Sequence, residues 1–193
     1  MPMPRTPQFP PRRFLRVPLL LGLSLLAVGG GSVLDVACGH GRHMRHLAGL
    51  GHTVTGIDRD QAAIEAVAPL GQALLADIEN GPWPLPGRTF GAVVVTNYLW
   101  RPVLPAIVDA VGPGGVLIYE TFASDHASVG RPSRPDFLLQ PGELLRVCQG
   151  LRVVAYEDGY IAEPERFVQR IAAVREVRSD GAPPPRYPLD AAG

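Results

Sequence analysis

Lysine is absent from the 193-residue sequence, in which all eighteen basic residues are arginines. A P-loop ATPase needs a lysine on its phosphates, and a pyridoxal phosphate enzyme needs one for its Schiff base. Both classes of enzyme are therefore excluded. Eighteen acidic residues balance the arginines, so the formal net charge is zero. A neutral chain lacks the basic surface that sequence-independent nucleic-acid binding requires, and we expect no direct nucleic-acid partner.

Cysteine is also scarce, since Cys38 and Cys148 are the only two and have no C-x-x-C spacing. Such a pair cannot form a disulfide framework, which predicts a reduced protein. The apolar run "FLRVPLLLGLSLLAVGGG" over residues 14–31 resembles a secretory signal but is too short for a confident membrane span. We favour an apolar helix ended by glycines, and so an N-terminal extension over residues 1–31. A membrane partner is not expected.

From residue 32 onward, strand and helix patterns alternate. Strands are predicted over residues 32–37, 52–58, 72–78, 90–99, 115–123, 151–161 and 166–177, and helices over 42–50, 60–70, 102–111 and 141–150. This alternation predicts an α/β fold, a three-layer αβα Rossmann-like sandwich. Because the last two strands have only a short connection, they must pair antiparallel in a mixed seven-stranded sheet. The domain then covers residues 32–178, and the aperiodic tail 179–193 is predicted to be disordered.

The stretch "DVACGHGRHMRH" over residues 35–46 allows two hypotheses. One is a zinc or copper site, because His40, His43 and His46 are three residues apart and Cys38 lies just upstream. The other is a nucleotide loop after the first strand.

Two observations favour the loop. Gly39 and Gly41 allow a tight turn and close approach of the backbone to a ligand. The apolar stripe Met44, Leu47 and Leu50 should face the sheet, which turns His43 and His46 sideways or outward. We therefore predict no metal.

The motif and the charge near this loop indicate which nucleoside-containing cofactor it binds. A dinucleotide fingerprint needs a third glycine where this chain has Met44. Asp35, expected at the mouth of the loop, repels phosphate and suits a cation. S-adenosylmethionine carries an ammonium, a sulfonium and a ribose but no phosphate. Asp58, at the end of the second strand, is placed to accept hydrogen bonds from ribose hydroxyls.

At these residues the sequence resembles the class I S-adenosylmethionine-dependent methyltransferases, over about residues 32–177. "VLDVACGHG" resembles the first motif, with Ala37 at its first glycine position, while "TGIDRD", "LLADIE", "FGAVVVTNYLW" and "VGPGGVLIYETF" resemble the next four in order. The resemblance implies Asp58 on the ribose, Arg59 near the adenine, and Asp77 and Ile78 flanking it. The expected cofactor-binding residues are Asp35, Ala37, Cys38, Gly39, His40, Gly41, Asp58, Arg59, Asp77, Ile78 and Thr96.

Two segments are candidates for the acceptor side. "TNYLWRP" over residues 96–102 lacks the prolines with which nucleic-acid amino-methyltransferases orient a flipped base, and its Asn97 and Tyr98 are the candidates for positioning an acceptor. Residues 120–142 form a long connection that mixes Arg131 and Arg134 with apolar residues, which predicts a lid that docks.

The expected function is in-line methyl transfer from S-adenosylmethionine to a small molecule, with S-adenosylhomocysteine as product. The compact size is similar to the tellurite-resistance type methyltransferases. A cytoplasmic monomer or homodimer is expected, because the donor is made in the cytosol. The alternatives are a non-catalytic cofactor-binding or partner-supporting protein, an RNA or protein methyltransferase, and the metal-binding protein described above.

Overall fold

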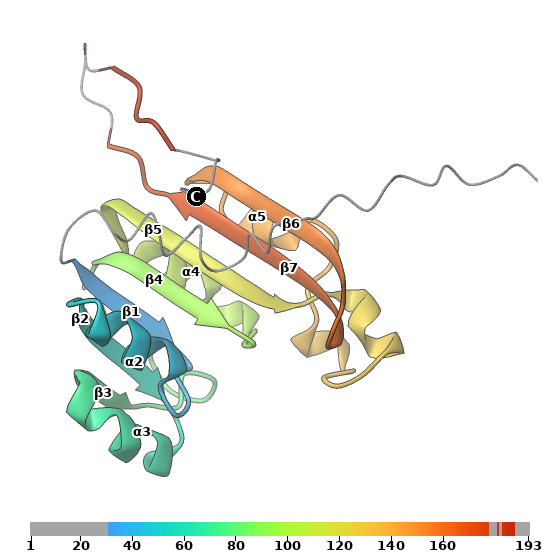
Figure 1. The fold of residues 1–193 in the computed structure, drawn as a ribbon, viewed down its shortest axis with the longest axis horizontal. Helices are drawn as coiled ribbons and strands as arrows, with labels where there is room; N and C mark the ends of the chain where they lie inside the picture. The colour runs from blue at the N-terminus through green and yellow to red at the C-terminus, as the bar shows by residue number, and fades with distance from the viewer. Residues whose placement is uncertain (1–30, 178–180, 182, 188–193) are drawn as a thin grey trace, which may run out of the picture.

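Seven strands form one mixed sheet in the order β3-β2-β1-β4-β5-β7-β6 (Figure 1). The strands are β1 Ser32–Val36, β2 Thr53–Asp58, β3 Gln72–Leu75, β4 Phe90–Thr96, β5 Val111–Phe122, β6 Arg152–Ala162 and β7 Glu165–Val174. β7 runs antiparallel to both of its neighbours, and the other neighbouring strands of this sheet pair parallel. The predicted fold class and the antiparallel last strand are therefore confirmed.

The computed structural model describes residues 31–177, 181 and 183–187. The predicted helix in the N-terminal extension and most of the predicted tail lie outside these residues. No helix in the described ranges is both long and apolar enough to span a membrane.

Helices cover both faces of the sheet, as Figure 1 shows. The helices are α2 Arg42–Gly49, α3 Gln61–Val67, α4 Leu104–Asp109 and α5 Glu143–Val147, with 3₁₀ turns at η1 Ala68–Leu70, η2 Arg101–Val103, η3 Ser124–Ser128 and η4 Pro135–Phe137. Successive strand residues face opposite layers. In β1, Val33 packs in the same buried cluster as Met44 of α2, whereas Leu34 shares a cluster with Ile107 of α4 and Leu144 of α5. The central strands are therefore buried on both faces, as a parallel sheet requires.

Several predicted boundaries are wrong for local reasons. The strand predicted to reach residue 99 stops at Thr96, because Asn97 adopts a left-handed φ of 53°. The "GPGG" stretch lies inside β5, where a register shift against β4 absorbs it. Leu50 does not face the sheet: it follows the last residue of α2 and is 58% exposed.

We predict opposite effects on stability from two glycine substitutions beside the β2–β3 layer. An alanine Cβ at Gly71 would lie 2.2 Å from the main-chain oxygen of Val54. Because that oxygen belongs to the backbone of β2, it cannot move away to relieve the clash. Gly71→Ala should lower the free energy of unfolding by about 2 kcal/mol or more. At Gly49 in α2 nothing lies within 4 Å, so Gly49→Ala should raise it by up to about 1 kcal/mol. Urea denaturation measures both, and effects of the same sign would contradict the packing described.

Candidate functional site

A cavity of about 200 Å³ lies at the carboxyl ends of the strands on the β3 side of the sheet. Its lining follows the ends of β1, β2, β3 and β4 and consists of Ala37, Ile57, Asp58, Arg59, Ala76, Asp77, Ile78, Glu79 and Tyr98. In doubly wound sheets this edge is where ligands bind. The cavity therefore coincides with the nucleoside site predicted from the sequence.

The loop expected to hold the cofactor, residues 37–41, which we call the cofactor loop, turns through left-handed backbone at three positions. Ala37, Gly39 and Gly41 have φ values of 54°, 50° and 75°. A Cβ at Gly39 would meet nothing within 4 Å, so glycine serves the backbone conformation there. A Cβ at Gly41 would lie 2.4 Å from Cγ1 of Val67, so this glycine also permits close packing against α3. The alanine at position 37 adopts a conformation that costs a non-glycine residue about 1–2 kcal/mol.

The Asp58 carboxylate joins the end of β2 to this loop. Its Oδ2 accepts the Gly39 N–H at 2.8 Å, and its Oδ1 accepts the Asp60 N–H at 2.9 Å. Each carboxylate oxygen has two acceptor positions, so both oxygens keep capacity for further donors. Because Asp58 also lines the cavity, two adjacent hydroxyls of a ligand could bond it there.

Charged side chains form the rim of the cavity, and apolar ones form its floor. Arg59 and Glu79 make an ion pair at 3.3 Å across the ends of neighbouring segments. The Asp77 carboxylate accepts hydrogen bonds from the Asn80 side chain and from the Glu79 main chain, which lower the pKa of Asp77. Ile78 is 7% exposed and belongs to the apolar floor. This combination suits a flat ring with polar substituents.

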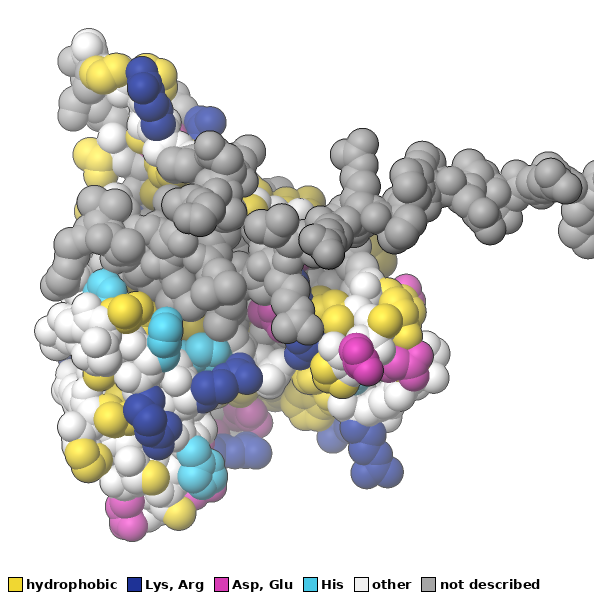
Figure 2. Space-filling view, in the orientation of Figure 1, with side chains coloured by type: hydrophobic (Ala, Val, Ile, Leu, Met, Phe, Trp, Pro, Cys, Tyr) yellow, Lys and Arg dark blue, Asp and Glu magenta, His cyan; other side chains and the backbone are white. Residues whose placement is uncertain are grey.

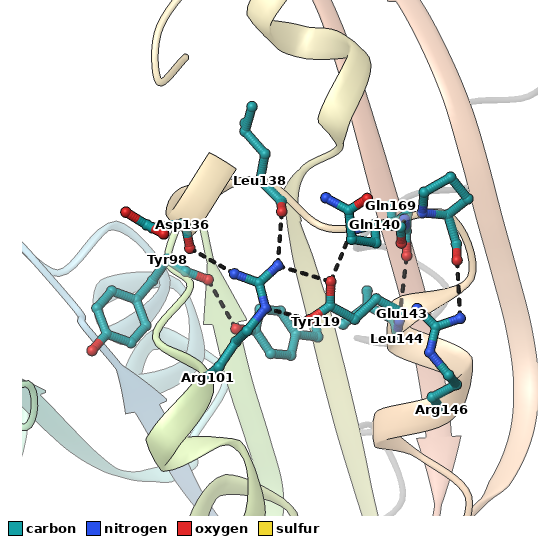
Figure 3. Close-up of polar contacts among 11 residues, drawn as sticks. Tyr98, Arg101, Tyr119, Asp136, Leu138, Gln140, Glu143, Leu144, Arg146 and Gln169 are labelled. Atoms are coloured by element: carbon teal, nitrogen blue, oxygen red, sulfur yellow. Dashed lines mark hydrogen bonds and ion pairs between the residues drawn. The ribbon is translucent and has the colours of Figure 1, made fainter. Parts of the chain in front are cut away.

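Tyr98 brings a hydroxyl to the cavity from the segment after β4. The Tyr98 Oη is buried and has no hydrogen-bond partner among the residues that the structure describes. Burial raises the pKa of Tyr98 above its usual range, so the phenol stays protonated at neutral pH. Its main-chain oxygen accepts the Tyr119 O–H at 2.9 Å, which holds this segment in place (Figure 3). Asn97, the other predicted positioning residue, is exposed and does not line the cavity.

Asp35 does not lie at the mouth of the loop, contrary to the sequence analysis. Its side chain is 1% exposed within β1, beneath the cofactor loop. Its Oδ2 has no partner in the described part of the chain, and burial raises the pKa of Asp35 to about 7. The carboxylate is therefore not part of the cavity surface, because its strand position points it into the layer under α2.

The histidines of the same stretch do not gather. His40 and His46 are exposed, while His43 is half-buried with Nδ1 3.5 Å from Oγ1 of Thr96. Burial lowers the pKa of His43 to about 4 and raises that of Cys38 to about 12. Within the described ranges, no three His, Cys, Asp or Glu side chains lie close enough to hold a metal ion.

Arg101 joins the predicted lid to Glu143 of α5, as Figure 3 shows. Its guanidinium donates to both Glu143 carboxylate oxygens at 2.8 and 2.9 Å, and to the main-chain oxygens of Asp136 and Leu138 at 2.9 Å each. Hydrogen bonding to Glu143 raises the pKa of Arg101. Leu138 and its neighbour Leu139 are 2% and 0% exposed, so the segment docks as predicted.

The two arginines of that segment, Arg131 and Arg134, make local contacts. Arg134 pairs with Asp136 at 2.9 Å and lies over the ring of Phe137, with its side chain 72% exposed. The main-chain oxygen of Arg131 bonds the ring of His126. Neither arginine lines the cavity.

The sequence-predicted site residues thus divide into two groups. Those that line the cavity are Ala37, Asp58, Arg59, Asp77, Ile78 and Tyr98. Those that surround it without lining it are Asp35, Cys38, Gly39, His40, Gly41, Thr96 and Asn97. Sequence reasoning missed Ile57, Ala76 and Glu79 in the lining and Glu143 under the docked segment. Ile57 and Ala76 adjoin predicted site residues, but nothing in the sequence connects Glu143 with Arg101.

The comparisons with known proteins agree with this geometry. Residues 33–115 match a family model described as a methyltransferase domain. No curated protein matches the chain.

Three solved structures illustrate the fold. TehB from Haemophilus influenzae is 20% identical with a TM-score of 0.62; the match covers 80% of this chain and 61% of that one. A TehB-like SAM-dependent methyltransferase from Corynebacterium glutamicum is 20% identical over 79% of this chain and 84% of that one, with a TM-score of 0.58. The [4+2]-cyclase SpnF is 17% identical over 82% of this chain and 79% of that one, with a TM-score of 0.64.

These findings confirm the resemblance to class I S-adenosylmethionine-dependent methyltransferases. The methyltransferase-domain match covers residues 33–115, and the chain has the fold of these solved structures. The cyclase shows that the fold by itself does not specify the reaction.

Asp35 should make the stability of the protein depend on pH. Because its pKa is near 7 in the folded state and 3.8 ordinarily, the folded chain retains a proton that the unfolded chain loses between these values. The free energy of unfolding should therefore fall from about pH 4 to about pH 7, by at most about 1.4 kcal/mol per pH unit. Asp35→Asn should flatten this profile in urea denaturation at pH 5 and pH 8. The exposed-site variant Asp109→Asn should keep it, and parallel profiles for all three proteins would contradict the assignment.

The two tyrosine hydroxyls should have opposite effects on stability. Tyr98→Phe removes a buried hydroxyl that has no partner among the described residues, so the free energy of unfolding should stay equal or rise by up to about 1 kcal/mol. Tyr119→Phe removes the donor to the Tyr98 main-chain oxygen and should lower it by about 1 kcal/mol. Urea denaturation of the unliganded protein separates the two. A destabilised Tyr98→Phe would show that its hydroxyl has a partner.

Proposed function

We propose that the protein transfers a methyl group from S-adenosylmethionine to a small-molecule acceptor. The observation that carries the proposal is the cavity at the carboxyl ends of β1 to β4, where the Asp58 carboxylate meets the cofactor loop inside a methyltransferase domain. The TehB-like protein of Corynebacterium glutamicum, which shares the fold, is described as S-adenosylmethionine-dependent. A cytosolic location follows from the cofactor, and we propose a monomer or homodimer.

The residues of the cavity fit the nucleoside half of that cofactor. Asp58 would hold the ribose hydroxyls, and Ile57 and Ile78 would contact the adenine ring beneath the Arg59–Glu79 ion pair. Cofactor sites commonly measure about 300–1,000 Å³, more than the cavity of about 200 Å³. The methionine half would therefore extend past the cofactor loop toward Thr96, where β4 ends.

S-adenosylmethionine supplies a methyl carbon bonded to a positively charged sulfur. When bound, it would give this methyl carbon to a lone pair of the acceptor, the electron pair of the broken carbon–sulfur bond would stay on sulfur, and any displaced acceptor proton would pass to water. What the chain contributes is alignment and the exclusion of bulk solvent. Tyr98 is suited to donate a hydrogen bond and unsuited to act as a base, because its pKa is raised. His43, with its pKa near 4, is neutral at physiological pH.

A small acceptor is favoured by the surroundings of the site. The segment over residues 123–139 is held by Arg101 and by two buried leucines, so it would limit the space for an acceptor beyond the end of β4. The formal net charge of zero disfavours a nucleic-acid acceptor.

Calorimetric titration with S-adenosylhomocysteine tests the cofactor assignment. Wild-type protein should bind at micromolar concentration, and Asp58→Ala should weaken binding by at least ten-fold through lost ribose hydrogen bonds. Asp60→Asn is the matched control, because Asp60 is adjacent, carries the same charge and does not line the cavity. Equal affinity of wild type and Asp58→Ala would refute the placement of the ribose.

Catalysis needs a separate measurement, because a cofactor-binding protein could pass the first test. Incubation with S-adenosylmethionine and a panel of small metabolites should release S-adenosylhomocysteine with at least one acceptor. Binding without turnover on any acceptor would favour the non-catalytic alternative.

A further inference from the structure

A row of polar side chains crosses the sheet where β4 ends, on the face that carries α2. Thr96 of β4 pairs in register with Glu120 of β5, Glu120 with Arg170 of β7, and Arg170 with Glu157 of β6. Side chains of directly paired residues lie on the same face of a sheet. His43 of α2 approaches the first of them, Thr96, at 3.5 Å. We call these four strand residues the polar row.

Ion pairs connect the outer part of the polar row. Arg170 Nε lies 2.6 Å from Glu120 Oε2, and Arg170 Nη1 lies 3.1 Å from Glu157 Oε2. The side chains of Glu120 and Arg170 are only 13% and 18% exposed. Charged groups are rarely covered to this extent unless they are paired. Arg170 therefore lies between two carboxylates, although among the described residues its Nε makes no hydrogen bond of good geometry.

The polar row marks the edge of the core on this face. Val116 and Ile118 precede Glu120 at alternate positions of β5, and each is 4% exposed. In Figure 2, arginine and acidic side chains show in the hollow between the α2 side of the molecule and the lobe that carries η3 and η4. The row thus lies at the carboxyl edge of the sheet, beside the end of β4 where the cofactor site begins.

At this edge of the sheet, the guanidinium of Arg166 keeps N–H donors that no described residue accepts. Arg166 lies four residues before Arg170 on β7, so its side chain shares that face. Its ion pair with Glu120 is long, 3.8 Å from Nη1 to Oε1, and its Nε has no hydrogen-bond partner in the described ranges. A guanidinium presents five N–H donors in a planar fork that matches a carboxylate. Arg166 is therefore able to take a second carboxylate beside Glu120.

We propose that Arg166 binds the carboxylate of an organic acid that is the methyl acceptor, with the rest of the acceptor extending along the polar row toward Thr96. Neighbouring strands are about 4.8 Å apart and β7 lies two strands from β4, so an elongated acceptor about 10 Å long spans this path. Phe122, two residues beyond Glu120 on the same face, adds an apolar contact that suits an organic acid better than a bare inorganic anion. The inference rests on the proposed function for the identity of the methyl donor.

The test is calorimetry on the full-length protein saturated with S-adenosylhomocysteine. The probes are benzoate, phenylacetate and hexanoate, each beside its primary amide, with inorganic phosphate as a further anion. At least one acid should bind ten-fold tighter than its amide, and Arg166→Gln should abolish that preference. Glu120→Gln should strengthen acid binding several-fold, because it removes the carboxylate that competes for Arg166. Arg134→Gln, which alters an exposed arginine outside the row, should change nothing.

Two results would overturn the proposal: acids that bind no tighter than their amides, or an Arg166→Gln protein that binds them like wild type. Phosphate binding tighter than every acid would overturn the carboxylate class. The affinity for S-adenosylhomocysteine is measured first on each variant. Wild-type protein that binds S-adenosylhomocysteine but none of the acids would refute the role of Arg166 and leave the proposed function standing. Failure to bind S-adenosylhomocysteine refutes the proposed function, and titration of the unliganded protein with the same acids still decides whether Arg166 holds a carboxylate.

Discussion

The Asp58 carboxylate connects the end of β2 to the cofactor loop that follows β1 and to the start of α3. One of its oxygens accepts from Gly39 in the loop after β1, and the other accepts from Asp60, which in turn caps α3. A loop with three left-handed residues would otherwise have many conformations to lose on binding a ligand. The carboxylate restricts that loop, which lowers the conformational entropy that binding a ligand would cost.

The other side of the site depends on the alternation of side chains between the two faces of β5. Tyr119 and Glu120 are consecutive and therefore face opposite layers of the sheet. Tyr119 holds the segment after β4 by its hydrogen bond to the Tyr98 main-chain oxygen. On the other face, Glu120 forms ion pairs with Arg170 and Arg166. Arg101 joins the first of these layers to the docked segment. The ends of β4 and β5 are thus supported on both faces.

Most of the fold could be predicted from the sequence, because hydrophobic periodicity and glycine turns are local signals. The alternation of strands and helices predicted the sheet and its antiparallel end, and the loop motif predicted the positions of Ala37 and Asp58 in the cavity. Asp35 was misplaced, because its depth depends on how α2 packs above it. The Arg101–Glu143 pair joins residues 42 positions apart, and the polar row depends on register between four strands. Neither leaves a local pattern in the sequence.

The manner in which Arg101 holds the docked segment bears on how this protein could change over evolutionary time. Two of its contacts there are to main-chain oxygens, those of Asp136 and Leu138, which residues of any type would supply. The exposed side chains of that segment can therefore vary while the attachment through Arg101 persists. A lineage could remodel that part of the surface by point substitutions without first losing the fold, which is one route by which related proteins acquire different substrates.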